Sequence, residues 1–492
     1  MELSLRANLM ATPISTICLL RFLLYASLLS LKSGFAFEGR ESAESHHVQP
    51  THHNVHITSL MPSSVCSPSP KGHDQRASLE VVHKHGPCSK LRPHKANSPS
   101  HTQILAQDES RVASIQSRLA KNLAGGSNLK ASKATLPSKS ASTLGSGNYV
   151  VTVGLGSPKR DLTFIFDTGS DLTWTQCEPC VGYCYQQQEH IFDPSTSLSY
   201  SNVSCDSPSC EKLESATGNS PGCSSSTCLY GIRYGDGSYS IGFFAKERLF
   251  LTSTDVFNTF QFGCGQNNRG LFGGTAGLLG LARNPLSLVS QTAQKYGKVF
   301  SYCLPSSSSS TGYLSFGSGD GDSKAVKFTP SEVNSDYPSF YFLDMVGISV
   351  GERKLPIPKS VFSTAGTIID SGTVISRLPP TVYSSVQKVF RELMSDYPRV
   401  KGVSILDTCY DLSKYKTVKV PKIILYFSGG AEMDLAPEGI IYVLKASQVC
   451  LAFAGNSGDD EVAIIGNVQQ KTIHVVYDDA EGRVGFAPRG CN

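Results

Sequence analysis

Charged side chains are scarce in this chain, because Asp, Glu, Lys and Arg make up only 17% of its 492 residues. Gly, Ser and Tyr are instead plentiful, and this profile favours an all-β protein with many short strands and turns over a helical one. Beyond the first 36 residues no apolar run is long enough to span a bilayer, so no membrane is expected for the processed chain. The length leaves room for two or more domains.

The one long apolar stretch lies near the start of the chain. Arg6 precedes Ile14–Leu31, which Arg21 interrupts, and small residues follow up to Ala36. This pattern predicts a cleaved signal peptide over residues 1–36. A Ser-rich, acid-poor leader also fits a plastid transit peptide, and that alternative stays open.

A second C-x-x-C motif is missing, which weakens a zinc interpretation of Cys177 and Cys180. His190 supplies the only nearby imidazole, so we expect no metal site and no cofactor. Twelve of the 15 cysteines lie from Cys177 onward, an even number behind a secretory leader. A disulfide-bonded protein of an oxidising compartment is the better interpretation.

Histidine is almost absent from residues 141–492, since ten of the 12 lie between His46 and His101. Residues 37–140 also carry a net charge of +6, against −4 for residues 141–492. We interpret residues 37–140 as a largely disordered, His-rich prosegment, and the chain from residue 124 to residue 147 as a Gly/Ser/Lys linker. Two pieces of it have regular patterns, a strand over residues 79–83 and an amphipathic helix over residues 107–119.

The charge partition suggests how such a prosegment would be released. At neutral pH it attracts the acidic body, whereas below about pH 6.5 its histidines take up protons. We therefore expect acid to release the prosegment, followed by cutting within the linker. Carboxylate protonation alone would place the release near pH 4–4.5.

The stretch FIFDTGSDLTWT, residues 164–175, places Asp167 at the end of an apolar strand. A carboxylate there is costly unless it is hydrogen-bonded or used. Thr168 and Ser170 supply hydroxyls beside it, and Gly169 permits a tight turn. The same pattern returns 203 residues later, where Asp370 is followed by Ser371, Gly372 and Thr373. Two such copies predict an internal duplication with one site shared between the halves.

Each half contains a second matched element. Leu278-Leu279-Gly280 ends 113 residues after Asp167, and Ile464-Ile465-Gly466 ends 96 residues after Asp370. Between Asp167 and Leu278, Tyr234-Gly235-Asp236-Gly237 reads as the tip of a β-hairpin. The Cys-rich segment 177–228 interrupts the strand pattern, and Asn202-Val203-Ser204 inside it fits a glycosylation acceptor.

With these motifs the chain resembles the pepsin-like aspartic proteases, in particular the plant nepenthesin-type branch that includes the chloroplast-nucleoid DNA-binding proteases. The resemblance covers roughly residues 145–492. It implies a bilobal all-β fold of two duplicated lobes, residues 141–325 and 326–492, with an active cleft between them.

In that family pattern Asp167 and Asp370 form the catalytic dyad. Thr168 and Ser371 lock the two loops together, and Ser170 and Thr373 hydrogen-bond the outer carboxylate oxygens. Tyr234 is the flap tyrosine, with Trp174, the only Trp, as its partner. The resemblance also implies six disulfides: Cys177–Cys180, Cys184–Cys264, Cys205–Cys228, Cys210–Cys223, Cys303–Cys491 and Cys409–Cys450.

The implied activity is hydrolysis of peptide bonds at acid pH by a monomeric enzyme made as a zymogen, with proteins or peptides as substrates and its own prosegment as a partner. The alternatives are a catalytically silent inhibitor or binding protein on the same scaffold, and a DNA-binding protease. The acidic body has no basic stripe interleaved with aromatics, so attraction to phosphates would rest on the Lys414–Lys422 patch or on the prosegment, and the sequence argues against DNA. Secretion to the apoplast or vacuole is expected, with the chloroplast as the alternative.

Overall fold

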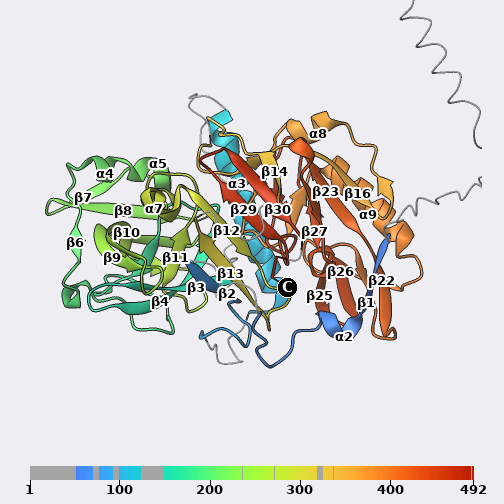
Figure 1. Cartoon of the computed structure of the whole chain (residues 1–492), viewed down its shortest axis with the longest axis horizontal. Helices are drawn as coiled ribbons and strands as arrows, with labels where there is room; N and C mark the ends of the chain where they lie inside the picture. Colours follow the sequence, from blue (N-terminus) through green and yellow to red (C-terminus); the bar gives the residue numbers. More distant parts are fainter. Residues whose placement is uncertain are drawn as a thin grey trace, which may run out of the picture. The chain divides into compact units, whose positions relative to one another are not determined.

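The structure is a computed structural model that describes residues 51–69, 77–91, 99–123, 149–234, 237–270, 272–317, 325–335, 337–488 and 490–491. All of these residues belong to one structural unit, Pro50–Asn492 (Figure 1). The expected signal peptide over residues 1–36 lies outside the described residues. Among the described residues no helix is both long and apolar enough to cross a membrane.

Strands dominate the described chain, and the all-β expectation is confirmed. The largest sheet has 15 strands, in the order β14-β30-β29-β12-β13-β2-β3-β4-β11-β5-β10-β9-β8-β7, with β6 paired to β9. Its strands are β2 (Ser78–His83), β3 (Tyr149–Leu155), β4 (Arg160–Asp167), β5 (Trp174–Gln176), β6 (Ser201–Asn202), β7 (Gly222–Ser224), β8 (Thr227–Arg233), β9 (Tyr239–Phe250), β10 (Val256–Arg269), β11 (Gly277–Gly280), β12 (Val299–Cys303), β13 (Thr311–Phe316), β14 (Lys327–Pro330), β29 (His474–Asp478) and β30 (Arg483–Ala487).

The second half of the chain forms three smaller sheets, ordered β15-β18-β28-β19-β27, β17-β16-β23-β24 and β20-β21-β26-β25, and β22 pairs with β1. These strands are β1 (His52–His56), β15 (Phe342–Leu343), β16 (Met345–Val350), β17 (Arg353–Lys354), β18 (Thr367–Ile369), β19 (Ser376–Leu378), β20 (Arg399–Val400), β21 (Cys409–Tyr410), β22 (Thr417–Pro421), β23 (Ile423–Phe427), β24 (Glu432–Asp434), β25 (Ile441–Lys445), β26 (Gln448–Leu451), β27 (Phe453–Gly455) and β28 (Ala463–Ile465).

Two described helices are long, α3 (His101–Leu123) and α9 (Pro380–Leu393). Pro380 suits the first turn of α9, where its missing N–H leaves no bond unmade. The short helices are α2 (Ile57–Leu60), α4 (Pro208–Glu211), α5 (Leu213–Thr217), α6 (Leu288–Gln291), α7 (Ala293–Tyr296), α8 (Lys359–Ser363) and α10 (Pro437–Ile440), with 3₁₀ turns η2 (Pro194–Thr196) and η3 (Ser428–Gly430).

Pairing between parallel strands explains the repeated motifs. In the first half β11 runs parallel to β4, with Gly280 opposite Asp167. In the second half β28 runs parallel to β18, with Ile465 opposite Ile369. Strands buried on both faces need continuous apolar sequence, which is why these segments are rich in Phe, Ile and Leu. The apolar-apolar-Gly segments are therefore the neighbours of the two Asp-bearing strands.

The interpretation of residues 37–140 as largely disordered is wrong for the part that the structure describes. The predicted strand over residues 79–83 is present as β2, and the predicted helix over residues 107–119 is the centre of α3. Both elements have apolar faces that the body covers: Val81 is 0% exposed and Ile115 is 1% exposed. Both patterns were recognised in the sequence, but the high Pro, Ser and His content around them gave no sign that the body covers their apolar faces.

Four of the six implied disulfides are wrong. Cys303–Cys491 and Cys409–Cys450 are present as expected. The proposed pairs Cys177–Cys180, Cys184–Cys264, Cys205–Cys228 and Cys210–Cys223 are replaced by Cys177–Cys264, Cys180–Cys184, Cys205–Cys223 and Cys210–Cys228. A further disulfide, Cys66–Cys88, lies in the N-terminal region.

Strand register and burial explain the corrected pairs. Strand β10 runs parallel to β5 with Cys264 opposite Thr175, and the Cys177 N–H donates to the Gly265 carbonyl, so Cys177 comes within a Cα–Cα distance of 5.3 Å of Cys264. Cys223 and Cys228 lie opposite each other in the β7–β8 hairpin, but Cys223 is exposed on the edge strand β7 whereas Cys228 on β8 is buried. Cys228 therefore pairs with the buried Cys210, and Cys223 is left for Cys205.

Candidate active site

The two strand-end carboxylates meet at the loops that follow β4 and β18. Each loop packs closely against a glycine of the neighbouring strand segment. A Cβ on Gly280 would lie 2.2 Å from the Asp171 carbonyl oxygen, and a Cβ on Gly466 would lie 2.7 Å from the Val374 carbonyl oxygen. Both distances are below any real Cβ contact, so the two glycines are required by packing.

The glycines of the motifs themselves bring the two halves together. A Cβ on Gly372 would lie 2.4 Å from Asp167 Oδ1, and a Cβ on Gly169 would lie 2.7 Å from Asp370 Oδ1. Each motif thus passes directly over the carboxylate of the other. Any side chain at either position would push the two carboxylates apart.

Hydroxyl groups lock the loops as the motif resemblance implied. The Thr168 N–H donates to Ser371 Oγ over 3.1 Å, and the Ser371 N–H donates to Thr168 Oγ1 over 2.9 Å. All four atoms are buried, so each bond is made without competition from water. Asn467 supports the second loop by donating from Nδ2 to the Ser371 carbonyl over 3.0 Å.

Matched hydrogen bonds hold the two carboxylates. Asp167 accepts from the Gly169 N–H at 3.0 Å and from Ser170 Oγ at 2.5 Å. Asp370 accepts from the Gly372 N–H at 3.0 Å and from Thr373 Oγ1 at 2.6 Å. Asp167 and Asp370 are both 0% exposed. Carboxylates buried in this way persist only when they are hydrogen-bonded and neutralised.

The pKa values of the two groups move in opposite directions. Burial alone would raise the pKa of Asp167, but the Arg111 charge and the hydrogen bonds from Ser170 and Gly169 hold it below its ordinary range. Burial raises the pKa of Asp370, and the Asp167 charge adds to this rise against the effect of Arg111. Since each of two adjacent carboxylates disfavours ionisation of the other, Asp370 is the member of the pair that holds a proton more readily.

Arg111 of α3 is a residue that the sequence interpretation missed. Its Nη2 donates to Asp167 Oδ1 at 2.7 Å and to Asp370 Oδ2 at 2.9 Å, and its Nε and Nη1 each make one further bond, to Asp370 and Asp167 respectively. Burial opposes its charge, but the two carboxylates outweigh that effect and raise the pKa of Arg111 further. The guanidinium occupies the position beside both carboxylates where a reacting group would have to sit.

Other contacts hold α3 in this place. Asp108, which is 0% exposed, accepts from the N–H groups of Val374 and Ile375 at 2.6 and 3.1 Å and pairs with Arg377 at 3.1 Å. One turn beyond Arg111, the Gln116 amide exchanges two hydrogen bonds with the backbone of Val462. The docking is therefore specific on both sides of the dyad. Asp108 and Arg111 were within the predicted helix, but nothing in the helix pattern marked their partners.

The hairpin tip is described only in part, since Gly235 and Asp236 lie outside the described residues. Tyr234 and Ser238 close a turn through a 2.8 Å backbone bond, and Gly237 has a φ of +81°, which favours glycine. Trp174 Nε1 donates to Tyr234 Oη at 2.8 Å, which confirms the implied pair. Trp174 is 0% exposed, so this bond ties the hairpin to the rigid interior.

The structure also describes the candidate glycosylation site and the two cysteines that were considered as zinc ligands. Asn202 is exposed on β6, where its side chain accepts from Tyr200 Oη at 2.8 Å, so glycosylation there stays a prediction. Cys177 and Cys180 both belong to disulfides and are not available as metal ligands.

Comparison with protein families matches the body of the chain in two parts. Residues 149–318 match a family described as xylanase inhibitor N-terminal, and residues 340–488 match one described as xylanase inhibitor C-terminal. The junction falls between the two Asp motifs, in agreement with the duplication seen in the sequence.

Several plant proteins are similar over most of the chain. An Arabidopsis thaliana aspartyl protease family protein is 59% identical, with 89% of this chain and 93% of the relative covered. The aspartyl protease AED1 of the same plant is 52% identical, covering 92% and 95%. The aspartic proteinase nepenthesin-2 of Nepenthes gracilis is 38% identical, covering 70% and 78%.

Solved structures share the fold. Basic 7S globulin from soybean is similar with a TM-score of 0.56 at 23% identity, over 69% of this chain and 92% of that one. A crystal structure described as edgp has a TM-score of 0.56 at 23% identity, over 71% and 93%. Likeness at this identity supports the two-lobed fold alone.

Proposed function

The chain belongs to the nepenthesin-type branch of the plant pepsin-like aspartic proteases, and from that premise we propose that it is an acid endopeptidase made as an inactive zymogen. The observation that carries this proposal is the pair Asp167 and Asp370, buried, matched in their hydrogen bonds and opposite in their pKa shifts. A structural pair of carboxylates would gain nothing from such an arrangement.

The proposed chemistry uses water as the nucleophile. Once Arg111 has left, a water molecule takes its place between the two carboxylates. Asp167, ionised, accepts a proton from the water as the oxygen attacks the peptide carbonyl, and Asp370, protonated, donates to the carbonyl oxygen. General acid–base catalysis of this kind contributes roughly 10²- to 10⁴-fold, so positioning of the substrate under the Tyr234 hairpin has to supply much of the rest.

Inhibition of the zymogen follows from the contacts of Arg111. It neutralises both carboxylates and fills the site of the attacking water. Acid would weaken this block. Docking of α3 lowers the pKa of Asp167, so the docked state is stabilised while this carboxylate is ionised. That stabilisation is lost as the pH falls through the lowered pKa. Acid therefore favours release of α3.

A catalytically silent inhibitor is the second candidate, because both matched family descriptions refer to xylanase inhibitors. Loss of catalysis would leave the dyad or its hydroxyl partners free to change. Here Asp167, Asp370, Ser170 and Thr373 are all present and joined in pairs. An intact site favours the enzyme. DNA binding has no comparable support, since residues 141–492 carry a net charge of −4.

We further propose passage through the secretory pathway to the apoplast or vacuole, with the chloroplast as the alternative. All 12 cysteines from Cys177 onward are disulfide-bonded, which suits an oxidising compartment. Asn202 is exposed and accessible to a glycosyltransferase there. The leader over residues 1–36 is proposed to be the signal.

The test of function starts from the purified zymogen and measures the activity that appears after processing. The purified zymogen is incubated from pH 7 to pH 3, and hydrolysis of a denatured protein substrate is followed with and without pepstatin. Pepstatin-sensitive hydrolysis that is confined to acid pH supports the proposal. A correctly folded, fully processed protein without hydrolysis at any pH would favour the inhibitor.

A further inference from the structure

Asp108 of α3 binds to the body at a site that offers three donors to its carboxylate. Its Oδ1 accepts from the Val374 N–H at 2.6 Å, and its Oδ2 accepts from the Ile375 N–H at 3.1 Å and lies 3.1 Å from Arg377 Nη1. The side chains of Asp108 and Arg377 are 0% and 4% exposed, so water weakens this ion pair little. All three donors belong to the body, whereas Asp108 belongs to the segment that is proposed to leave.

We propose that this site becomes a subsite for an acidic side chain of the substrate once α3 has left, and that Arg377 is the residue that recognises it. The occupant is the carboxylate of an Asp or Glu in the bound peptide, which takes the place of Asp108. The inference rests on the proposed function and deepens it, because it names a class of substrate for the cleft of Asp167 and Asp370.

The site lies close to the catalytic pair. Val374 directly follows Thr373, whose Oγ1 donates to Asp370 Oδ2 at 2.6 Å. On α3, Asp108 precedes Arg111 by three residues, which is about 4.5 Å along a helix axis. Because each residue of an extended peptide advances about 3.3 Å, the acidic side chain should belong to a residue within about three positions of the cut bond.

The body itself holds Arg377 in place. Arg377 lies on β19 opposite Ile464 of β28, and its Nη1 donates to the Ile375 carbonyl at 2.7 Å. Its buried Nη2 makes no hydrogen bond within the described part of the chain, so the guanidinium has a donor left for a ligand. Among the described residues Asp108 is also the only carboxylate in ion-pair contact with Arg377. Departure of α3 therefore leaves a guanidinium without its counter-charge, which favours a new anionic partner.

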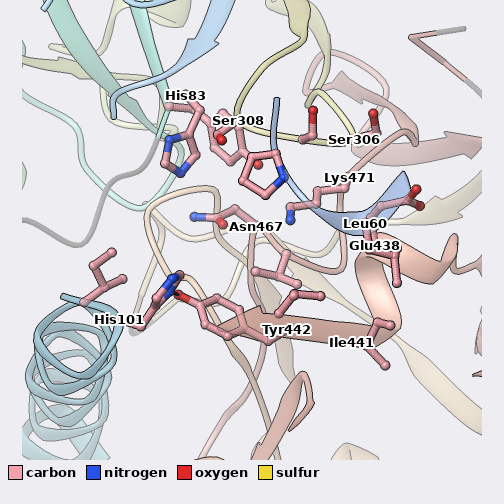
Figure 2. A pocket seen from close by; sticks show the side chains of 16 residues that line it. Leu60, His83, His101, Ser306, Ser308, Glu438, Ile441, Tyr442, Asn467 and Lys471 are labelled. Atoms are coloured by element: carbon pink, nitrogen blue, oxygen red, sulfur yellow. Dashed lines mark hydrogen bonds between the residues drawn. The ribbon is translucent and has the colours of Figure 1, made fainter. Parts of the chain in front are cut away.

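The surface beside Asp108 has room for a peptide. Ile104, one turn before Asp108, is 8% exposed and packs in an apolar cluster of the second half of the chain. Figure 2 shows His101, at the start of α3, beside Tyr442 on the wall of a cavity of about 160 Å³ that Ile104 also lines. Departure of α3 would remove His101 and Ile104 from that wall. The cavity and the apolar surface under Ile104 would then form one groove beside the carboxylate site.

The test uses the full chain, cut at a protease site placed within residues 124–147 and then exposed to acid to release the prosegment. Its substrates are pairs of quenched fluorescent peptides that differ only by Glu or Gln at one position of an otherwise uncharged sequence. The pair is placed in turn at each of the three positions on either side of the cut bond. Assays at pH 5 keep a free Glu ionised, because its ordinary pKa is about 4.3.

At one position we expect the Glu peptide to have a kcat/KM about tenfold above that of the Gln peptide, mainly through KM. The reason is that hydrogen bonds to a charged group are stronger than those to a neutral one. Equal or lower values for Glu at every position would overturn the proposal.

A variant of Arg377 tests whether this residue makes the distinction. Arg377→Gln is made together with Asp108→Asn, so that the zymogen keeps no unpaired carboxylate at the site. Asp108→Asn alone is the matched control, because its body after release of α3 is identical to the wild type. The Glu-to-Gln ratio of kcat/KM should fall to about one in the double variant and keep the wild-type value in the control.

If the double variant does not fold, Arg377→Lys takes its place. Lys keeps the charge but not the planar fork of donors, so the ratio should fall without reaching one. An unchanged ratio in the variant that folds would overturn the assignment to Arg377.

Binding separates this inference from the proposed function. The same peptide pairs, with a reduced bond that cannot be hydrolysed, are titrated into the processed protein and followed by fluorescence anisotropy. Tighter binding of a Glu peptide by a protein that hydrolyses nothing would contradict the proposed function and leave the subsite standing. Hydrolysis without a preference for Glu in rate or in binding would contradict the subsite and leave the proposed function standing.

Discussion

Replacement of Arg111 by Ala should convert the uncut zymogen into a partly active enzyme. Arg111 makes its bonds to both carboxylates with a side chain that is only 15% exposed. Removal of one partner from a buried ion pair costs about 3–5 kcal/mol, because the remaining charges stay buried without compensation. At about 1.4 kcal/mol per tenfold change, the population with α3 undocked should rise by roughly two to three and a half orders of magnitude.

The assay compares initial rates of hydrolysis of a short fluorogenic peptide by zymogens that cannot be cut in the linker. Arg118→Ala is the matched control, because Arg118 lies on the same helix, is exposed, and places its guanidinium over the Phe340 ring at 5.2 Å. We expect activity in Arg111→Ala before any processing and none in Arg118→Ala. Equal silence of both variants, in protein that becomes active once α3 is cut away, would refute the assignment of Arg111 as the block.

Three further predictions concern the hairpin, the histidines and the cysteines. Tyr234→Phe removes the acceptor of the 2.8 Å bond from Trp174 and should slow turnover by roughly 5-fold, at about 1 kcal/mol for one hydrogen bond. Tyr234→Ala should slow turnover more than it weakens pepstatin binding. Unchanged kinetics in both variants would mean that the hairpin does not close over substrate. Burial lowers the pKa of His83 to about 3 and that of His85 to about 2, so both stay neutral while residues 51–91 are bound and take up protons near pH 6.5 once released. Binding is therefore lost as the pH falls from 6.5 towards 3. The double variant His83→Gln, His85→Gln should move the midpoint of release, measured by native mass spectrometry, to lower pH, whereas His56→Gln, at an exposed position, should not. An unmoved midpoint in the double variant would mean that these histidines do not control release. Thiol titration of the denatured body should find no free thiol, and two or more would contradict the disulfide assignment.

The catalytic motifs could be predicted from the sequence because their geometry is local. Asp167 with its Gly and Ser neighbours, and Asp370 with its Gly and Thr neighbours, form their main hydrogen bonds within three residues. The glycines at 280 and 466 could be found as well, since each ends a strand that pairs beside an Asp-bearing strand. Repetition at matched spacing made these short patterns specific.

Contacts between distant segments could not be predicted in this way. Arg111 lies 56 residues from Asp167 and 259 from Asp370, and an amphipathic helix pattern does not distinguish it from Arg118. The disulfides of the insertion failed for a related reason. Cys223 and Cys228 lie opposite each other in one hairpin, and which of them is buried depends on how that hairpin packs. Strand β2 was recognised, but its neighbours in the sheet were not.

The most direct test of the account is a comparison of Asp167→Asn and Asp370→Asn with the wild-type chain after identical removal of α3. Each Asn keeps the shape of the side chain but cannot ionise, so the pair can no longer share one proton. With the same thermal unfolding midpoint as the wild type within a few degrees, each variant should lose at least 99% of the pepstatin-sensitive hydrolysis at acid pH, as expected from loss of an effect of roughly 10²-fold or more. A folded single variant that keeps more than a few per cent of the wild-type rate would contradict the assignment of the dyad and, with it, the proposed function.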